Sequence, residues 1–132
     1  MLDDICKAND IINNLFQKTS ITKTQLDTLL SNVEGKRRDI TLNNRINLRD
    51  KKPVKIGAFL RSYEQAKHNI KSSIYTIILF QYLGLLTDDS LNLIIETSNI
   101  ISKTDNENIS NESSENILHI VDQIVNTLTE RL

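Results

Sequence analysis

The chain has 132 residues, enough for one domain with a hydrophobic core, and it contains only 3 Gly and 1 Pro. Because an all-β fold needs many tight turns, this composition disfavours one and predicts an all-α fold. The single cysteine, Cys6, excludes an intrachain disulfide and a thiolate metal cluster, and it favours a reducing cytoplasm. The N-terminus has no basic segment before an apolar one, so we expect no signal peptide.

Charge is strongly segregated along the sequence. Residues 36–71 hold 11 of the 16 Lys and Arg and 3 of the 17 Asp and Glu, a net charge of +8. Residues 1–35 carry −2 and residues 72–132 carry −7, so the whole chain sums to −1. A compact block of positive charge repels itself and attracts polyanions. The pattern therefore favours binding to a polyanion, above all nucleic acid, over a solvated basic loop.

Two helices are predicted before the basic block. The first is expected at about residues 3–17, where apolar side chains recur every three or four positions. The second begins near Thr22, which has capping-box spacing with Gln25. We expect it to end at Gly35, because glycine is favoured at a left-handed helix end.

Residues 40–48 allow two interpretations. Apolar residues alternate with polar ones around Asn43 and Asn44, as in a short β-hairpin. The same residues could instead form a short helix that ends near Asp50. Pro53 disfavours a helix that continues through residue 52.

A long central helix is predicted from about Ile56 to the position before Gly84. An apolar stripe with a period near 3.6 follows its whole length, and its second half is apolar almost all round. This half, including Ile74, is therefore expected to be the core of the domain. The most apolar run, residues 74–86, is shorter than the roughly 20 residues that span a bilayer, so no membrane partner is expected.

The C-terminal third predicts two more helices. Thr87, Asp88 and Asp89 resemble a helix N-terminus, residues 103–114 read as a flexible linker, and a closing helix is expected at about residues 115–131. The predicted organisation is a helical DNA-binding domain over 1–102, a linker over 103–114 and a packing helix over 115–132. The broad apolar stripe of that last helix predicts a homodimer. Its predicted dimerisation residues are Leu118, Val121, Ile124, Val125 and Leu128.

Little in the sequence indicates catalysis. His68 and His119 lie on different predicted helices without a carboxylate or cysteine cluster at ligand spacing, so no metal site is expected. No glycine-rich phosphate loop is present, because the three glycines stand alone. We therefore expect a protein that is not an enzyme and that uses no cofactor.

The segment from Pro53 to Lys71 carries the strongest functional pattern. A helix N-terminus with the small residues Gly57 and Ala58 suits a phosphate, and the polar side chains of its first turns can contact base edges in the major groove. The basic residues before it would contact flanking phosphates. The predicted nucleic-acid-binding residues are Arg37, Arg38, Arg45, Arg49, Lys51, Lys52, Lys55, Arg61, Ser62, Gln65, Lys67, His68 and Lys71.

At residues 21–86 the chain resembles the helix-turn-helix and winged-helix DNA-binding regulators of prokaryotes, archaea included. The resemblance rests on a supporting helix, ITKTQLDTLL, a recognition helix, VKIGAFLRSYEQAK, and a closing segment, QYLGLL. It implies double-stranded DNA as partner, a homodimer, and a cytoplasmic, nucleoid-associated regulator or architectural protein. The chain departs from the pattern because its recognition helix is too long and no strand pair follows LGLL. Only residues 40–48 could serve as a wing.

Two alternatives remain open at this point. The basic block could dock an acidic protein, as in an adaptor or antitoxin-like interaction module. RNA binding is disfavoured because base stacking needs exposed aromatic side chains. Tyr63 is the only aromatic residue beside the basic residues in the sequence, and its place on the apolar stripe predicts that it is core.

Overall fold

The structure is a computed structural model that describes residues 2–4, 10–50, 54–104, 111–130 and 132. Its elements are α2 (Asp10–Gln17), α3 (Lys23–Arg37), α4 (Leu42–Arg45), the 3₁₀ helix η1 (Ile46–Leu48), α5 (Ile56–Tyr82), α6 (Asp88–Thr104) and α7 (Asn111–Glu130). The described residues contain no strand, so the predicted all-α fold is confirmed. Residues 2–4 are also helical, whereas Cys6 lies outside the described residues.

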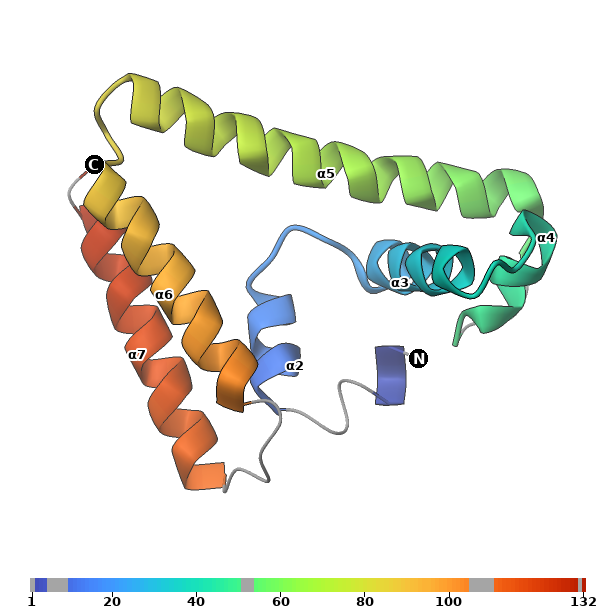
Figure 1. Cartoon of the computed structure of the whole chain (residues 1–132), viewed down its shortest axis with the longest axis horizontal. Helices are drawn as coiled ribbons and strands as arrows, with labels where there is room; N and C mark the ends of the chain where they lie inside the picture. Colours follow the sequence, from blue (N-terminus) through green and yellow to red (C-terminus); the bar gives the residue numbers. More distant parts are fainter. Residues whose placement is uncertain (1, 5–9, 51–53, 105–110, 131) are drawn as a thin grey trace.

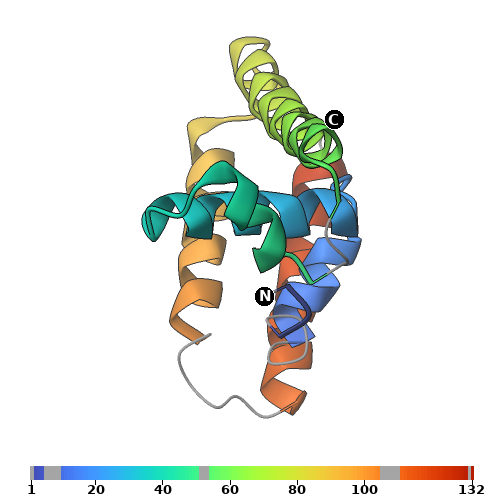
Figure 2. The same cartoon turned by 90° about the vertical axis from the view of Figure 1, so that its right-hand side faces the viewer.

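The 27-residue helix α5 connects two groups of helices (Figure 1). Its first half packs on α3, which also carries α4 and η1. Beyond its second half, α6 and α7 pack as a pair, and α2 packs on α7. The view turned by 90° shows α5 lying across the top of both groups (Figure 2). The chain is thus an open arch, with α5 as its span.

The predicted start of α3 is confirmed. The Thr22 hydroxyl accepts a hydrogen bond from the Gln25 backbone N–H at 3.2 Å, and the Gln25 side chain accepts one from the Thr22 N–H at 3.2 Å. The predicted end at Gly35 is wrong, because α3 continues to Arg37 and the left-handed conformation falls on Asp39, with φ 56°.

Gly35 has a packing role instead of a helix-ending role. The Arg45 side chain crosses α3 directly at Gly35, and a Cβ there would overlap Arg45 Cγ and lie 2.7 Å from its Cδ. Arg45 Nε donates to the Ile40 carbonyl at 2.8 Å, and its Nη1 donates to Asn32 Oδ1 at 3.0 Å. The missing side chain therefore lets Arg45 attach the α4 segment to α3.

Gly35→Ala should destabilise the protein although alanine is the better helix former. The added methyl group displaces Arg45 and breaks its two charge-assisted hydrogen bonds, so we expect a net loss of about 1–2 kcal/mol in urea denaturation. Gly57→Ala is the matched control, because nothing lies within 4 Å of a Cβ at that exposed position. It should be neutral or stabilise by up to about 1 kcal/mol. Equal effects of the two substitutions would contradict the Arg45 contact.

Most of the segment 40–48 is helical, from residue 42 to residue 48. These residues form α4 and η1, which pack on α3, so the β-hairpin interpretation is wrong and the short-helix interpretation is correct. A buried ion pair holds this segment in place: Arg49 Nε lies 3.7 Å from Asp27 Oδ2, and both side chains are 2% exposed. The Asp50 backbone N–H also donates to Asp27 Oδ2, at 3.1 Å. Burial of polar groups thus selects a helical turn over a strand pair.

The boundaries predicted for α5 are confirmed, but its second half is not the core. Phe59 and Ala66 are fully buried against α3, whereas Ile74 is 52% exposed. The Asn69 amide donates to Gln25 Oε1 at 2.8 Å, near the first residue of α3. Because α3 begins there, α5 runs past its packing partner from about residue 70 onward. Gly84, with φ 74°, follows the end of α5 as predicted.

The two C-terminal helices are longer than predicted. The Thr87 hydroxyl accepts a hydrogen bond from the Ser90 N–H at 3.2 Å at the start of α6. Within the predicted linker, residues 103–104 belong to α6 and residues 111–114 to α7, while 105–110 lie outside the described residues. The linker is therefore shorter than the sequence predicts.

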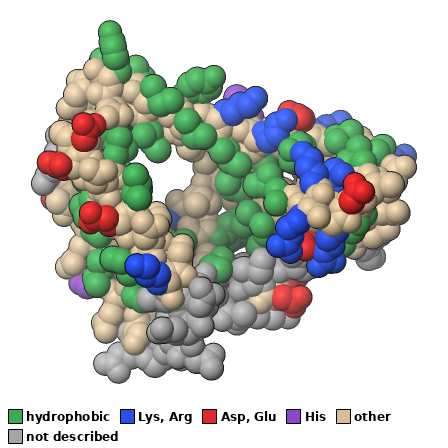
Figure 3. Space-filling view, viewed as in Figure 1, with side chains coloured by type: hydrophobic (Ala, Val, Ile, Leu, Met, Phe, Trp, Pro, Cys, Tyr) green, Lys and Arg blue, Asp and Glu red, His purple; other side chains and the backbone are tan. Residues whose placement is uncertain are grey.

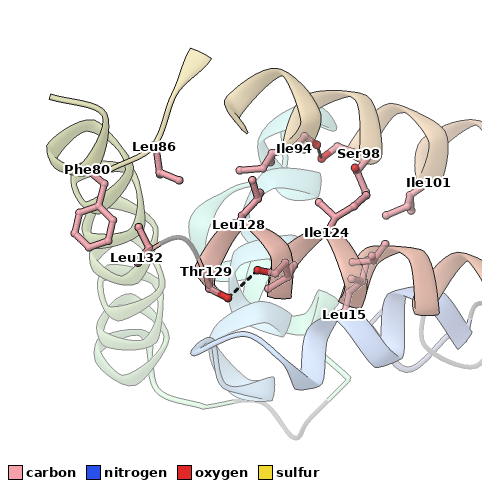
Figure 4. A pocket seen from close by; sticks show the side chains of 13 residues that line it. Leu15, Phe80, Leu86, Ile94, Ser98, Ile101, Ile124, Leu128, Thr129 and Leu132 are labelled. Carbon is pink, nitrogen blue, oxygen red and sulfur yellow. Dashed lines mark hydrogen bonds between the residues drawn. The ribbon is translucent and has the colours of Figure 1, made fainter. Parts of the chain in front are cut away.

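The apolar stripe of α7 packs within its own chain. Leu128 is buried, and Val121, Ile124 and Val125 line an apolar cavity of about 450 Å³ between α2, α6, α7 and the end of α5 (Figure 4). Lys18, which follows α2, forms an ion pair with Asp122 of α7. Part of the predicted dimerisation stripe therefore lines an intramolecular cavity, whereas Val125 is 51% exposed.

Candidate nucleic-acid interface

The two ends of the arch differ in charge. Lys and Arg side chains gather over α3, α4 and the first half of α5, whereas the face around α6 carries mainly acidic and apolar side chains (Figure 3). We call the exposed or half-exposed basic residues among 36–38 and 55–71, at the end of α3 and along the first part of α5, the basic end. Its members are Lys36, Arg37, Arg38, Lys55, Arg61, Lys67 and Lys71.

The last turn of α3 supplies one cluster of the basic end. Glu34 accepts hydrogen bonds from Arg37 Nη2 at 2.8 Å and from Arg38 Nε at 2.6 Å. The hydrogen bond from Arg37, assisted by Arg38, holds the pKa of the Glu34 carboxyl below its usual value although burial opposes this shift. One ionised carboxylate therefore orients two guanidinium groups, and the cluster keeps a net positive charge.

Tyr63 joins this cluster to α5. Lys36 Nζ lies 5.6 Å from the centre of the Tyr63 ring, and Lys67 Nζ lies 5.0 Å from it. Lys67 also forms an ion pair with Glu64 at 3.1 Å. Lys36 was missed in the sequence analysis, although it belongs to the same Lys-Arg-Arg run as Arg37. The negative face of one aromatic ring thus brings cations of two helices together.

The exposed side of α5 brings three of the predicted base-contacting residues together. Arg61, Gln65 and His68 line one shallow polar cavity of about 480 Å³ with Glu64, Gln25 and Asn69. A second cavity of about 340 Å³ adjoins it along the helix, sharing His68 and including Lys71. The two cavities together form a groove along α5, which is polar from Arg61 to Ser72 and is lined by Tyr75 and Leu79 farther along the helix.

Two predicted contact residues have structural roles instead. Arg49 is buried beside Asp27, so it cannot reach a phosphate without unfolding its surroundings. The guanidinium group of Arg45 donates hydrogen bonds to the Ile40 carbonyl and to the Asn32 side chain. Ser62 is half-buried, and Lys51 and Lys52 lie outside the described residues. Sequence alone could not separate these arginines from the exposed ones, because all of them occur in one basic run.

The start of α5 lacks a side-chain cap. Lys55 occupies the N-cap position and its side chain makes no capping hydrogen bond. The first-turn N–H groups of α5 therefore point out of the helix beside basic side chains, an arrangement that suits an anion.

The connection between the two helices of the basic end differs from a helix-turn-helix unit. Residues 38–55 separate α3 from α5 and contain α4 and η1, whereas that motif joins its helices by a turn of three or four residues. Residues 42–48 are helical and do not form a wing. Any contact of α5 with DNA would therefore occur without the short turn of that motif.

Metal-binding groups and membrane-spanning helices are absent from the part of the chain that the structure describes. No three His, Cys, Asp or Glu side chains in these ranges come together in a way that could hold a metal ion. No described helix combines the length and the apolarity needed to cross a membrane. A scan of protein-family models and searches of curated proteins and of solved structures found no match to this chain.

Proposed function

We propose that this protein binds double-stranded DNA through its basic end and works as a homodimer, either as a transcriptional regulator or as a nucleoid-associated protein. The observation that carries the proposal is the separation of charge between the two ends of the arch. Residues 36–71 hold a net +8 against −7 in residues 72–132. A polyanion is therefore attracted to one end and repelled by the other, which orients it on the protein.

The groove along the first half of α5 supports duplex DNA as the polyanion. Arginine and glutamine side chains on one exposed helix face can reach base edges in the major groove, and the uncapped N-terminus of α5 can receive a phosphate. Lys36, Arg37 and Arg38 lie on the neighbouring helix, where they would contact the flanking backbone. None of the residues that line the first cavity is aromatic, and the second cavity includes one exposed ring, Tyr75. A single ring offers few stacking contacts, which favours a duplex over single-stranded nucleic acid.

The test is a fluorescence-anisotropy titration of a random duplex at 50 and 200 mM salt. Affinity should fall by at least about 10³-fold between the two conditions if six or more phosphates are contacted. Replacing Lys55 and Arg61 with Ala should weaken binding by about 10–100-fold and reduce the salt slope by about 2. Both side chains are exposed, so the melting temperature should hardly change.

The matched control is Lys18→Ala with Lys103→Ala, which removes the same charge outside the basic end. Its effect on affinity should be less than about threefold. Equal losses in both double variants would mean that net charge, not the basic end, drives binding. If polyglutamate binds as tightly as duplex at the same salt concentration, the partner is an acidic protein and the DNA proposal fails.

A further inference from the structure

The second half of α5 exposes an apolar surface that is too large to be incidental. The buried stripe of Phe59 and Ala66 continues along the same helix face to Ile70, Ile74 and Ile77. Six aliphatic side chains of this stretch are 36–58% exposed: Ile70, Ile74, Ile77, Ile78, Leu79 and Leu83. Tyr75 and Tyr82 are exposed beside them. We call residues 70–83 the apolar segment of α5.

The solvent-accessible surface of the chain is also larger than that of a compact monomer. A compact monomer of 15.1 kDa exposes about 7,100 Å² by the usual scaling with mass. This chain exposes 9273 Å², roughly 2,200 Å² more. Monomers rarely carry a contiguous apolar patch beyond a few hundred Å². The open arch therefore presents surface that an assembly would cover.

The charges flanking the apolar segment favour a second copy as its cover. Lys67 and Lys71 precede the segment, while Asp88 and Asp89 follow it at the start of α6. One end of the segment is therefore basic and the other end acidic. Such a surface is complementary to itself when a copy is turned end to end, whereas a parallel copy would place like charges together.

We propose that two copies of this chain pair antiparallel through the apolar segment of α5, around a two-fold axis near Ile77. The segment is about 21 Å long at 1.5 Å per residue. Lys67 and Lys71 of one copy then lie beside Asp88 and Asp89 of the other. Burying about half of the excess surface on each copy removes about 2,200 Å² in total, within the range of stable homodimers. The pairing gives the proposed homodimer its interface and holds whether or not DNA is the ligand.

The antiparallel pair also explains why the second half of α5 is apolar nearly all round. One side faces the partner copy, and Phe80 and Leu86 at its end line the cavity between α6 and α7 (Figure 4). This cavity accounts only for the end of α5, so the rest of the apolar segment is left for the partner copy.

Analytical ultracentrifugation of the full-length chain, without DNA, tests the pairing. The wild type should sediment as a dimer at about 20 µM, and Ile74→Glu with Ile78→Glu should sediment as a monomer with unchanged helical circular dichroism, because two carboxylates cannot be buried unpaired. Ile120→Glu is the control, an exposed isoleucine on α7 outside the segment, and should remain dimeric. A monomeric wild type, or a double variant that stays dimeric, would overturn the proposal.

Disulfide trapping tests the orientation even if the glutamate variant does not fold. In a Cys6→Ser background, Ile77→Cys lies at the axis and should cross-link two copies under mild oxidation. Ile70→Cys should not cross-link, since the two copies of residue 70 lie about 21 Å apart along the pair. Cross-linking at both positions would indicate a parallel pair, and cross-linking at neither would place the interface elsewhere. Either result would contradict the antiparallel pairing.

Discussion

Asp27→Ala is expected to lower the free energy of unfolding by about 3–5 kcal/mol, because it leaves the Arg49 guanidinium buried without its counter-ion. The Asp50 N–H loses its acceptor at the same time. Arg49 cannot turn to solvent, since its side chain is buried beneath the η1 segment. Chemical denaturation monitored by circular dichroism measures the loss.

Two controls distinguish the stability cost of an unpaired buried charge from the cost of losing any ion pair. Glu64→Ala removes an exposed carboxylate that pairs with Lys67, and it should change stability by less than about 1 kcal/mol. Replacing both buried partners, as Asp27→Leu with Arg49→Met, should recover most of the loss, because an apolar pair needs no counter-ion. A mild effect of Asp27→Ala, or no recovery in the double variant, would mean that the pair does not hold η1 on α3.

The buried pair also shows where sequence reasoning reached its limit. Helix boundaries follow local signals, so the capping box at Thr22 and the glycine after α5 located two elements correctly. Asp27 and Arg49, in contrast, look like surface residues in sequence, because nothing local reveals a partner 22 positions away. Charge density alone selected the exposed members of the basic end other than Lys36, and the buried Arg49 was included for the same reason.

The prediction that the apolar segment of α5 is the core failed for a different reason. Periodicity reports which side of a helix is apolar, and residues 70–83 do carry apolar side chains. It does not report what covers them. The prediction assumed a partner within the chain, yet α3 begins too late to reach Ile74. The stripe on α7 was assigned to a dimer by the same logic, although Ile124 and Leu128 of this stripe face a cavity that residues of α2 and α6 also line.

The antiparallel pair fixes the distance between two basic ends and thereby the length of DNA that both can contact. Arg61 lies 16 residues before the axis at Ile77. The two Arg61 side chains are therefore about 48 Å apart along the pair, which corresponds to about 14 base pairs. Affinity of the wild type should rise steeply between a 10-base-pair and a 30-base-pair duplex, because only the longer one can engage both copies.

Ile74→Glu with Ile78→Glu should abolish that rise. Affinity for the 30-base-pair duplex is expected to fall by about 10²–10⁴-fold, since two linked contacts become one, although no basic side chain is removed. Each variant chain also gains two negative charges, so the control is Ile95→Glu with Ile120→Glu, which carries the same charge on α6 and α7. The control variant should lose only the affinity that is due to its changed net charge, and the loss should be the same for both duplexes. If the α5 variant also loses equal affinity on the short and the long duplex, one basic end binds alone and pairing contributes nothing to recognition.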